Sequence, residues 1–232
     1  MSEATFSARA VWPPQPRRAS ASPRTAVWLA GLCVAALALT WVLAELVPAA
    51  RARDASLLVH FTQLGGTGLH EAARVILHLL DPLLFTIWAL ALVAIAVARG
   101  RPRIALAAAV VLAGAPIAAD RLKPLLAYHH VHIAHVFNAY ASWPSGHATA
   151  AGVLALCAVL VAPPRLRVAV ALAGAAFVLL SGAALLIDAW HMPSDVLGGY
   201  LFAALWMALA VAALRAAERR SASARPEAAL RS

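Results

Sequence analysis

Charged side chains are scarce in this sequence, and their scarcity excludes most water-soluble folds. Asp, Glu, Lys and Arg make up 12% of the 232 residues, whereas hydrophobic residues make up 63%. A water-soluble domain carries about twice that share of charge, because its surface must be hydrated. The sequence also contains no internal repeat and no polar segment long enough to form a separate soluble domain. We therefore expect lipid to solvate most of the chain.

Cysteine is also rare, which excludes a scaffold stabilised by several disulfides. The two cysteines, Cys33 and Cys157, each lie inside an apolar run. In such a run a free cysteine packs as a small hydrophobic residue. We expect no disulfide between them, and they carry no information about the cellular compartment.

Long apolar runs are the most prominent feature of the sequence. A helix needs about 20 apolar residues to cross about 30 Å of hydrocarbon. The runs that approach or reach this length are 26–46, 82–98, 104–119, 148–162, 168–187 and 196–214. The shorter ones need flanking residues, such as 72–80 before the second run, to complete a crossing. The first run has the alternative interpretation of a signal peptide, but its length favours an uncleaved helix. The sequence therefore predicts an all-α, polytopic membrane bundle of about six transmembrane helices.

The basic residues predict how this bundle is oriented. They punctuate the apolar runs and do not line one face, so the net charge of +9 does not indicate a nucleic-acid partner. With a cytoplasmic N-terminus, 14 of the 19 Lys and Arg residues lie on the cytoplasmic side. The other five, on the outside, are Arg51, Arg53, Arg74, Arg121 and Lys123. This bias predicts a multi-pass protein of the inner (plasma) membrane with both termini in the cytoplasm.

The two ends of the chain differ from its middle in composition. Residues 1–25 and 215–232 are rich in Ala, Ser, Pro and Arg and lack long apolar runs. They predict two disordered cytoplasmic tails around one membrane domain, residues 26–214. Within that domain, the outer connection 47–81 predicts a loop followed by a helix along the membrane interface.

Two short polar motifs stand at the outer ends of predicted helices. The first, Trp143-Pro-Ser-Gly-His147, opens the fourth apolar run, so its hydroxyl, amides and imidazole face the positive end of a helix. The second, Asp188-Ala-Trp-His191-Met-Pro-Ser-Asp195, opens the sixth and places a carboxylate four residues after His191. Taken singly, each motif is better explained without a function, the first as a helix cap and the second as a solvated histidine. Together with Lys123 at the outer end of the third run, they indicate a phosphate site on the outer face.

In order and spacing these motifs resemble the type 2 phosphatidic acid phosphatase (PAP2) superfamily. Its motifs are Lys-x6-Arg-Pro, Pro-Ser-Gly-His and Ser-Arg-x5-His-x3-Asp. The resemblance covers about residues 26–214 and implies that this segment is a phosphatase-like domain. It also implies that His191 attacks phosphorus, that His147 protonates the leaving oxygen and later activates water, and that Asp195 orients His191. It implies no metal and no cofactor.

The same resemblance assigns phosphate binding to Lys123, Ser145 and Gly146, but both motif arginines are missing. Six residues after Lys123 the sequence has His130 and Val131 in place of Arg-Pro. A protonated imidazole beside a phosphate dianion makes His130 the best substitute for the first arginine.

The third motif departs from the family pattern as well. Ala184 and Leu185 stand where the family has Ser-Arg, so a second bidentate phosphate clamp is absent. Each such contact is worth about 2 to 4 kcal/mol in a transition state. A catalytically weak or inactive family member that binds or moves a phosphorylated lipid is therefore the main alternative to an active enzyme.

A histidine-rich segment supplies a third hypothesis. The histidines are His129, His130, His132 and His135, and imidazoles at this density suit zinc, copper or nickel. No cysteine or carboxylate lies among them, which argues against a metal site. The function we expect is hydrolysis of a lipid phosphomonoester or pyrophosphate, such as phosphatidic acid, phosphatidylglycerol phosphate or undecaprenyl pyrophosphate. The sequence does not identify the lipid or the oligomeric state.

Overall fold

The computed structural model describes residues 23–126 and 142–229, which form eight α-helices and no strand. The helices are α1 (Pro23–Leu46), α2 (Pro48–Gln63), α3 (Thr67–His78), α4 (Pro82–Ala98), α5 (Pro102–Leu126), α6 (Gly146–Val161), α7 (Arg167–Ile187) and α8 (Pro193–Ala229). Five of them begin at proline, whose fixed φ and missing N–H suit the first helical position. The predicted all-α fold is confirmed.

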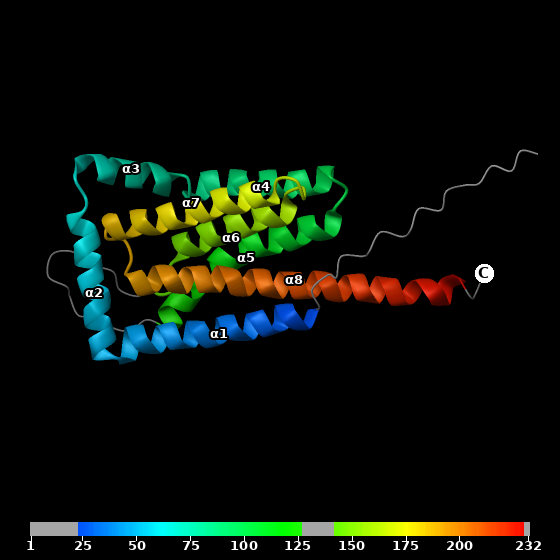
Figure 1. Cartoon of the computed structure of the whole chain (residues 1–232), viewed down its shortest axis with the longest axis horizontal. Helices are drawn as coiled ribbons and strands as arrows, with labels where there is room; N and C mark the ends of the chain where they lie inside the picture. Colours follow the sequence, from blue (N-terminus) through cyan, green and yellow to red (C-terminus); the bar gives the residue numbers. More distant parts are fainter. Residues whose placement is uncertain (1–22, 127–141, 230–232) are drawn as a thin grey trace, which may run out of the picture.

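The helices α1, α4, α5, α6, α7 and α8 run along the long axis of the molecule (Figure 1). Helix α2 lies across one end of this bundle and joins α1 to α3 (Figure 1). The connection 47–81 is thus two helices separated by a short turn, where the sequence predicts a loop and one interfacial helix. The C-terminal end of α7 and the N-terminal end of α8 lie at the same end of the bundle as α2 (Figure 1).

Helix length and hydropathy make the chain a multi-pass membrane protein. Among the described residues, α1, α5, α7 and α8 are each long and apolar enough to cross a membrane. Helices α3 and α4 pass the same test together but are bent by 51° at the break between them, so residues 72–80 do not extend the second span as a straight helix. Helix α6 is apolar but has only 16 residues. By length and hydropathy, four helices can span a membrane, or five if the bent pair is counted as one span. The sequence predicts about six.

Large apolar side chains cover the outside of the bundle. Trp28 on α1 is 79% exposed, Leu83 on α4 is 73% exposed, and Leu179 on α7 is 71% exposed. Against water this much exposed apolar surface carries a large free-energy cost, whereas against lipid tails it carries none. The exposed faces of these helices are therefore suited to contact lipid.

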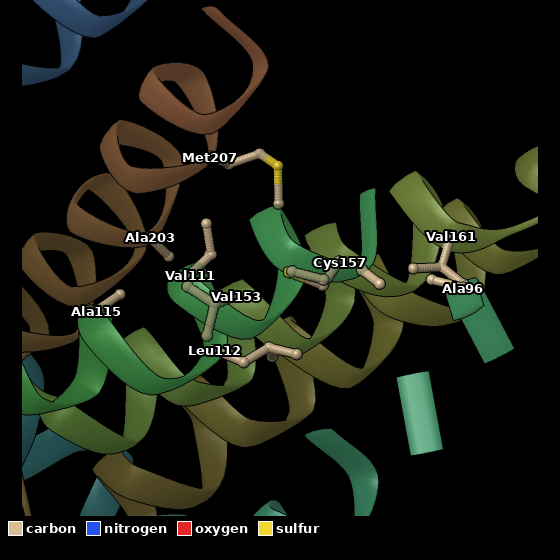
Figure 2. Packing of buried hydrophobic residues seen from close by; sticks show 11 residues of the cluster. Ala96, Val111, Leu112, Ala115, Val153, Cys157, Val161, Ala203 and Met207 are labelled. Carbon is tan, nitrogen blue, oxygen red and sulfur yellow. The ribbon is translucent and has the colours of Figure 1, made fainter. Parts of the chain in front are cut away.

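The main buried cluster lies where α5, α6 and α8 meet (Figure 2). Val111 comes from α5, Val153 and Cys157 from α6, and Ala203 and Met207 from α8. Figure 2 shows Met207 reaching from α8 toward the other two helices. Cys157 is free and buried, so it packs as a small hydrophobic residue, as the sequence predicts.

Helices α6 and α8 approach each other so closely that glycine is required at two contacts. A Cβ added to Gly152 would lie 2.7 Å from the Cβ of Ala203. A Cβ added to Gly199 would lie 2.6 Å from the carbonyl oxygen of Ser145. Small residues at a helix contact let the backbones touch, which is a common packing device in membranes. The N-terminal ends of α6 and α8 are consequently held side by side.

Helix α8 continues to Ala229, through most of the segment for which the sequence predicts a disordered tail from residue 215. Alanine, which is frequent here, has the highest helix propensity of all residues. Arg103 Nη2 also donates a hydrogen bond to Ser221 Oγ at 2.9 Å, which joins the first turn of α5 to this part of α8. A low apolar content therefore does not prevent the membrane helix from continuing beyond the bundle. The N-terminal tail predicted for residues 1–25 lies almost wholly outside the described residues.

The close contact of α6 and α8 yields a stability prediction. Gly199→Ala should lower the free energy of unfolding by about 2 kcal/mol relative to Gly31→Ala, because the new methyl group overpacks the contact. At Gly31 an added Cβ has no neighbour within 4 Å, so that variant controls for the helix propensity of alanine. Thermal unfolding in detergent measures the difference. Equal melting temperatures for the two variants would show that the contact is not tight.

Candidate active site

The N-terminal end of α6 carries the first polar motif. Ser145 is the N-cap, and its hydroxyl accepts a hydrogen bond from Ala148 N at 3.2 Å. Gly146 is the first helical residue, and a Cβ added there would lie 2.8 Å from Asp120 Oδ1. His147 follows in the first turn and is half-buried. The free amides and the positive end of the helix dipole make this end of α6 attractive to an anion.

The second motif forms the turn from α7 into α8. His191 lies in this turn and is 8% exposed, whereas Asp195 lies in the first turn of α8 and is 1% exposed. Asp195 Oδ2 accepts a hydrogen bond from Met192 N at 2.9 Å and lies 3.5 Å from His191 Nδ1. The His191 contact is longer than a normal hydrogen bond, as is common at catalytic sites without substrate. The carboxylate therefore faces one nitrogen of the His191 ring and leaves the other, Nε2, available for chemistry.

Backbone contacts join the two motifs. Ser145 N donates to the carbonyl oxygen of Asp195 at 3.0 Å. Thr149 Oγ1 donates to the carbonyl oxygen of Ser145 at 2.8 Å and lies 3.3 Å from that of Gly199. All of these groups lie at the close contact of α6 and α8, so the packing of the two helices sets the distance between the motifs.

The two histidines of the motifs are neighbours. The ring centroids of His147 and His191 are 6.4 Å apart, and the ring planes are inclined by 54°. His147 also makes an edge contact with Trp190, with centroids 5.4 Å apart. The structure thus brings together two imidazoles that are 44 residues apart in the sequence.

Lys123 reaches the same end of α6 from the last turn of α5. Its Nζ forms an ion pair with Asp120 Oδ1 at 2.7 Å, and a Cβ added to Gly146 would lie 3.5 Å from that Nζ. The Asp120 carboxylate therefore lies between the ammonium group and the front of the helix. A bound phosphate would have to share or replace this carboxylate as the partner of Lys123.

A cavity of about 410 Å³ opens beside these groups. Asp120, Lys123, Gly146 and His147 form its polar part. The remainder of its wall is almost entirely apolar, with Thr86 as the exception: Leu80, Pro82, Phe85, Leu112, Ala113, Pro116, Ile117 and Ala150. The cavity therefore combines an anion-binding end with an apolar wall formed by α4, α5 and α6.

Of the two positions at which the family motifs have arginine, the structure describes position 185 but not position 130. Leu185 is fully buried, and Ala184 is 2% exposed, in an apolar cluster with Leu58 of α2 and Leu77 of α3. This part of α7 therefore supplies packing and no cation. His130, the predicted substitute for the first arginine, lies outside the described residues, as do His129, His132 and His135.

Two contacts to the His191 turn are not predicted from the sequence. His70 Nδ1 on α3 lies 2.7 Å from Asp188 Oδ1. Asp54 on α2 accepts hydrogen bonds from Ser194 N at 3.0 Å and from Ser194 Oγ at 2.5 Å. The partners are 118 and 140 residues apart, and no local pattern in the sequence indicates such pairs. Asp54 and His70 each stand beside another charged residue, Arg53 and Glu71, so their polar character does not single them out in the sequence either.

The described part of the chain contains no group of three or more His, Cys, Asp or Glu side chains arranged to hold a metal ion. The histidine-rich segment that motivates a metal hypothesis lies within residues 127–141, outside the described residues.

Comparison with known proteins agrees with this geometry. The sequence model of the PAP2 superfamily matches residues 103–219, just over half of the chain. The chain belongs to the PAP2 superfamily. The PAP2 match contains Lys123 and both polar motifs, whereas α1 to α4 lie outside it.

A solved PAP2 structure shares the fold. It is the crystal structure of a transmembrane PAP2-type phosphatidylglycerolphosphate phosphatase from Bacillus subtilis. It superimposes with a TM-score of 0.61 at 19% identity, over 82% of this chain and 94% of that chain. Among curated proteins, none matches this chain significantly.

The ion pair at the anion site of this PAP2 member leads to a prediction about affinity. Asp120→Asn should strengthen binding of inorganic phosphate about two- to fivefold, because an exposed carboxylate competes for Lys123 with an energy of about 1 kcal/mol or less. Isothermal titration calorimetry on the detergent-solubilised protein measures this, with Glu71→Gln on exposed α3 surface as the control. Weaker phosphate binding in Asp120→Asn would mean that the carboxylate organises the site instead of competing for it.

Proposed function

We propose that the protein is a membrane phosphatase that hydrolyses a phosphomonoester or pyrophosphate on a lipid, through a phosphohistidine at His191. The observation that carries the proposal is the placement of His147 and His191 with ring centroids 6.4 Å apart, at two helix N-terminal ends joined by a backbone hydrogen bond. This arrangement lets a nucleophile and an acid approach one phosphoryl group from different sides. Membership of the PAP2 superfamily supports the same chemistry.

In the first step His191 Nε2 attacks phosphorus and forms an N–P bond, while the bond from phosphorus to the lipid oxygen breaks. His147, protonated, gives its proton to that oxygen, so the lipid leaves as a neutral alcohol or, from a pyrophosphate, as the monophosphate. Asp195 lies near His191 Nδ1 and stabilises the charge that the ring acquires. The Ser145 hydroxyl, the amides at Gly146 and the Lys123 ammonium group would hold the phosphoryl oxygens.

In the second step the neutral His147 removes a proton from water, and the oxygen of that water attacks phosphorus. The N–P bond breaks, inorganic phosphate leaves, and His191 returns to its initial state. His147 is protonated again at the end of the cycle, so the proton count balances over the two steps. One residue can serve as both acid and base because the water of the second step enters where the lipid oxygen left in the first. His147 therefore gives a proton to one oxygen and later takes a proton from the other at the same place.

The cavity supports a lipid as substrate. Its polar end contains Lys123, Gly146 and His147, and its wall along α4 and α5 is apolar. A phosphate headgroup at the polar end would leave the hydrocarbon chain in an apolar environment, which avoids the cost of exposing it to water. The specific headgroup is open among phosphatidic acid, phosphatidylglycerol phosphate and undecaprenyl pyrophosphate.

A second candidate function is binding or movement of a phosphorylated lipid without rapid turnover. The burial of Leu185 at the position of a family arginine favours it. So does the pairing of Lys123 with Asp120, because it reduces the positive charge available to a phosphate. Turnover by the wild-type protein decides between the two functions.

We also propose that both termini lie in the cytoplasm and that the site faces the outside. The described connections between α4 and α5 and between α6 and α7 contain Arg99, Arg101 and Arg165, and Arg167 is the first residue of α7. These connections lie opposite the site end of the bundle, because they follow the last residues of α4 and α6. The positive-inside rule then places the site end outside the cytoplasm.

The mechanism predicts different losses for the two histidines. His191→Ala should reduce phosphate release by about three orders of magnitude or more with every substrate, because the nucleophile is lost. His147→Ala should reduce release from a lipid phosphate by about 10²- to 10⁴-fold. It should impair the first-turnover release of p-nitrophenol from p-nitrophenyl phosphate much less, because that leaving group departs without protonation, whereas the later release of phosphate still needs His147 as a base. His60→Gln, an exposed position on α2, is the control, and unchanged release in His191→Ala would contradict the mechanism.

The orientation is tested by labelling single cysteines. In a background with Cys33 and Cys157 replaced by alanine, Gln63→Cys on α2 should react with a membrane-impermeant maleimide in intact cells. Arg165→Cys between α6 and α7 should react only after the cells are permeabilised. Both positions are exposed. The reverse labelling pattern would place the site in the cytoplasm.

A further inference from the structure

The turn that carries His191 is held at its first residue by α3. His70 Nδ1 lies 2.7 Å from Asp188 Oδ1, and the Asp188 side chain is only 8% exposed. The His70 ring is in turn confined by the short turn between α2 and α3, because a Cβ added to Gly65 would lie 2.3 Å from His70 Nε2. The ring is therefore fixed between a glycine backbone on one side and a buried carboxylate on the other.

The other end of the same turn is held by α2. Asp54 accepts hydrogen bonds from both Ser194 N and Ser194 Oγ, at 3.0 and 2.5 Å. Ser194 lies in the first turn of α8, next to Asp195, where the backbone N–H groups have no partner within the helix. Asp54 thus acts as an N-terminal cap for α8, although it belongs to a different helix.

Between these two anchors the backbone needs external support. Ala189 has a φ of 54°, in the left-handed region that alanine rarely adopts. The contact from Asp195 Oδ2 to His191 Nδ1 is 3.5 Å long, which alone does not fix the ring. The placement of His191 therefore depends on where residues 188 and 194 are held.

We infer that His70 and Asp54, which precede the segment 103–219 matched by the PAP2 sequence model, are positioning residues that hold the His191 turn, an inference that rests on the proposed function of His191 as nucleophile. Asp54 lines a different cavity, with Pro193 and Ser194, and His70 pairs with Asp188, so neither is assigned a contact with substrate. Loosening either anchor lets the His191 ring move away from the line of attack. Displacements of about 1 Å at a reacting group lower rates by up to about 100-fold.

Gly65→Ala tests the α3 anchor without changing either charged partner. The added methyl group should push the His70 ring away from Asp188, whereas Gly66→Ala, with no atom within 4 Å of the added Cβ, should not. Neither glycine has a positive φ, so both backbones accept alanine. We expect Gly65→Ala and His70→Ala to lower kcat about tenfold and Gly66→Ala to leave it unchanged.

Asp54 offers a test by conservative rescue. Asp54→Ala removes both acceptors for Ser194 and should lower kcat about tenfold. Asp54→Asn keeps a side-chain oxygen for Ser194 N and should restore most of the loss. Ser56→Ala, at an exposed position two residues after Asp54 on α2, is the matched control and should behave as wild type.

The decisive readout separates placement of His191 from phosphate binding and from folding. In Gly65→Ala and Asp54→Ala, the single-turnover rate of phosphohistidine formation should fall with kcat. KM and inhibition by inorganic phosphate should stay near wild type in both variants, because Ser145, Gly146 and Lys123 are untouched. The melting temperature should stay near wild type in Gly65→Ala, whereas Asp54→Ala loses a helix cap and should melt slightly lower. A wild-type protein that releases no phosphate from any lipid tested would overturn the proposed function and this inference with it. An active wild type with unchanged kcat in both variants, or with parallel losses in kcat and melting temperature in Gly65→Ala, would overturn the positioning role alone.

Discussion

The hydrogen bond from Ser145 N to the carbonyl oxygen of Asp195 is the contact on which the rest of the site depends. It joins the first turns of two helices that would otherwise meet only through side chains. Glycine at position 199 allows this approach, because any Cβ there would strike the Ser145 carbonyl oxygen. Thr149 adds a second link by donating to the Ser145 carbonyl oxygen beside Gly199. In a membrane, where association of helices relies on close packing and hydrogen bonds, such a contact determines geometry directly.

The electrostatics of the site follow from this packing. Two helix N-terminal ends point toward the same region, and their dipoles and amides supply positive potential that side chains alone do not. The described side chains supply one ammonium group, Lys123, and Asp120 partly compensates it. Leu185 contributes packing where related proteins carry a guanidinium. Phosphate binding in the proposed mechanism therefore depends on backbone groups more than it would in a site with two arginines, and His130 remains a predicted contributor.

Much of the architecture could be predicted because apolar runs and helix-start signals are local. Proline at the first position of α4, α5 and α8, and the Ser145 cap of α6, are local features whose consequences do not depend on the rest of the chain. Polar motifs at the starts of α6 and α8 could likewise be assigned to helix ends. That they lie side by side was indicated by the family resemblance, and the structure adds the contacts that hold them together.

What could not be predicted depends on contacts distant in sequence. Hydrophobic periodicity tells which face of α3 is apolar, but α2 has almost no such periodicity, and in neither helix does the pattern tell which polar partner lies opposite Asp54 or His70. The 51° bend between α3 and α4 likewise depends on how α3 packs on α7. The continuation of α8 to Ala229 could not be predicted from apolar content. A segment of low apolar content can keep the helical conformation of the span before it.

In the proposed mechanism His191 and His147 act on one phosphoryl group from different sides. A structure of the protein with orthovanadate, which mimics phosphorus during displacement, is the sharpest test of this arrangement. We expect vanadium bonded to His191 Nε2, with His147 within hydrogen-bonding distance of the opposite apical oxygen. Vanadate bound at Lys123 without a bond to His191, or His147 directed away from it, would contradict the mechanism.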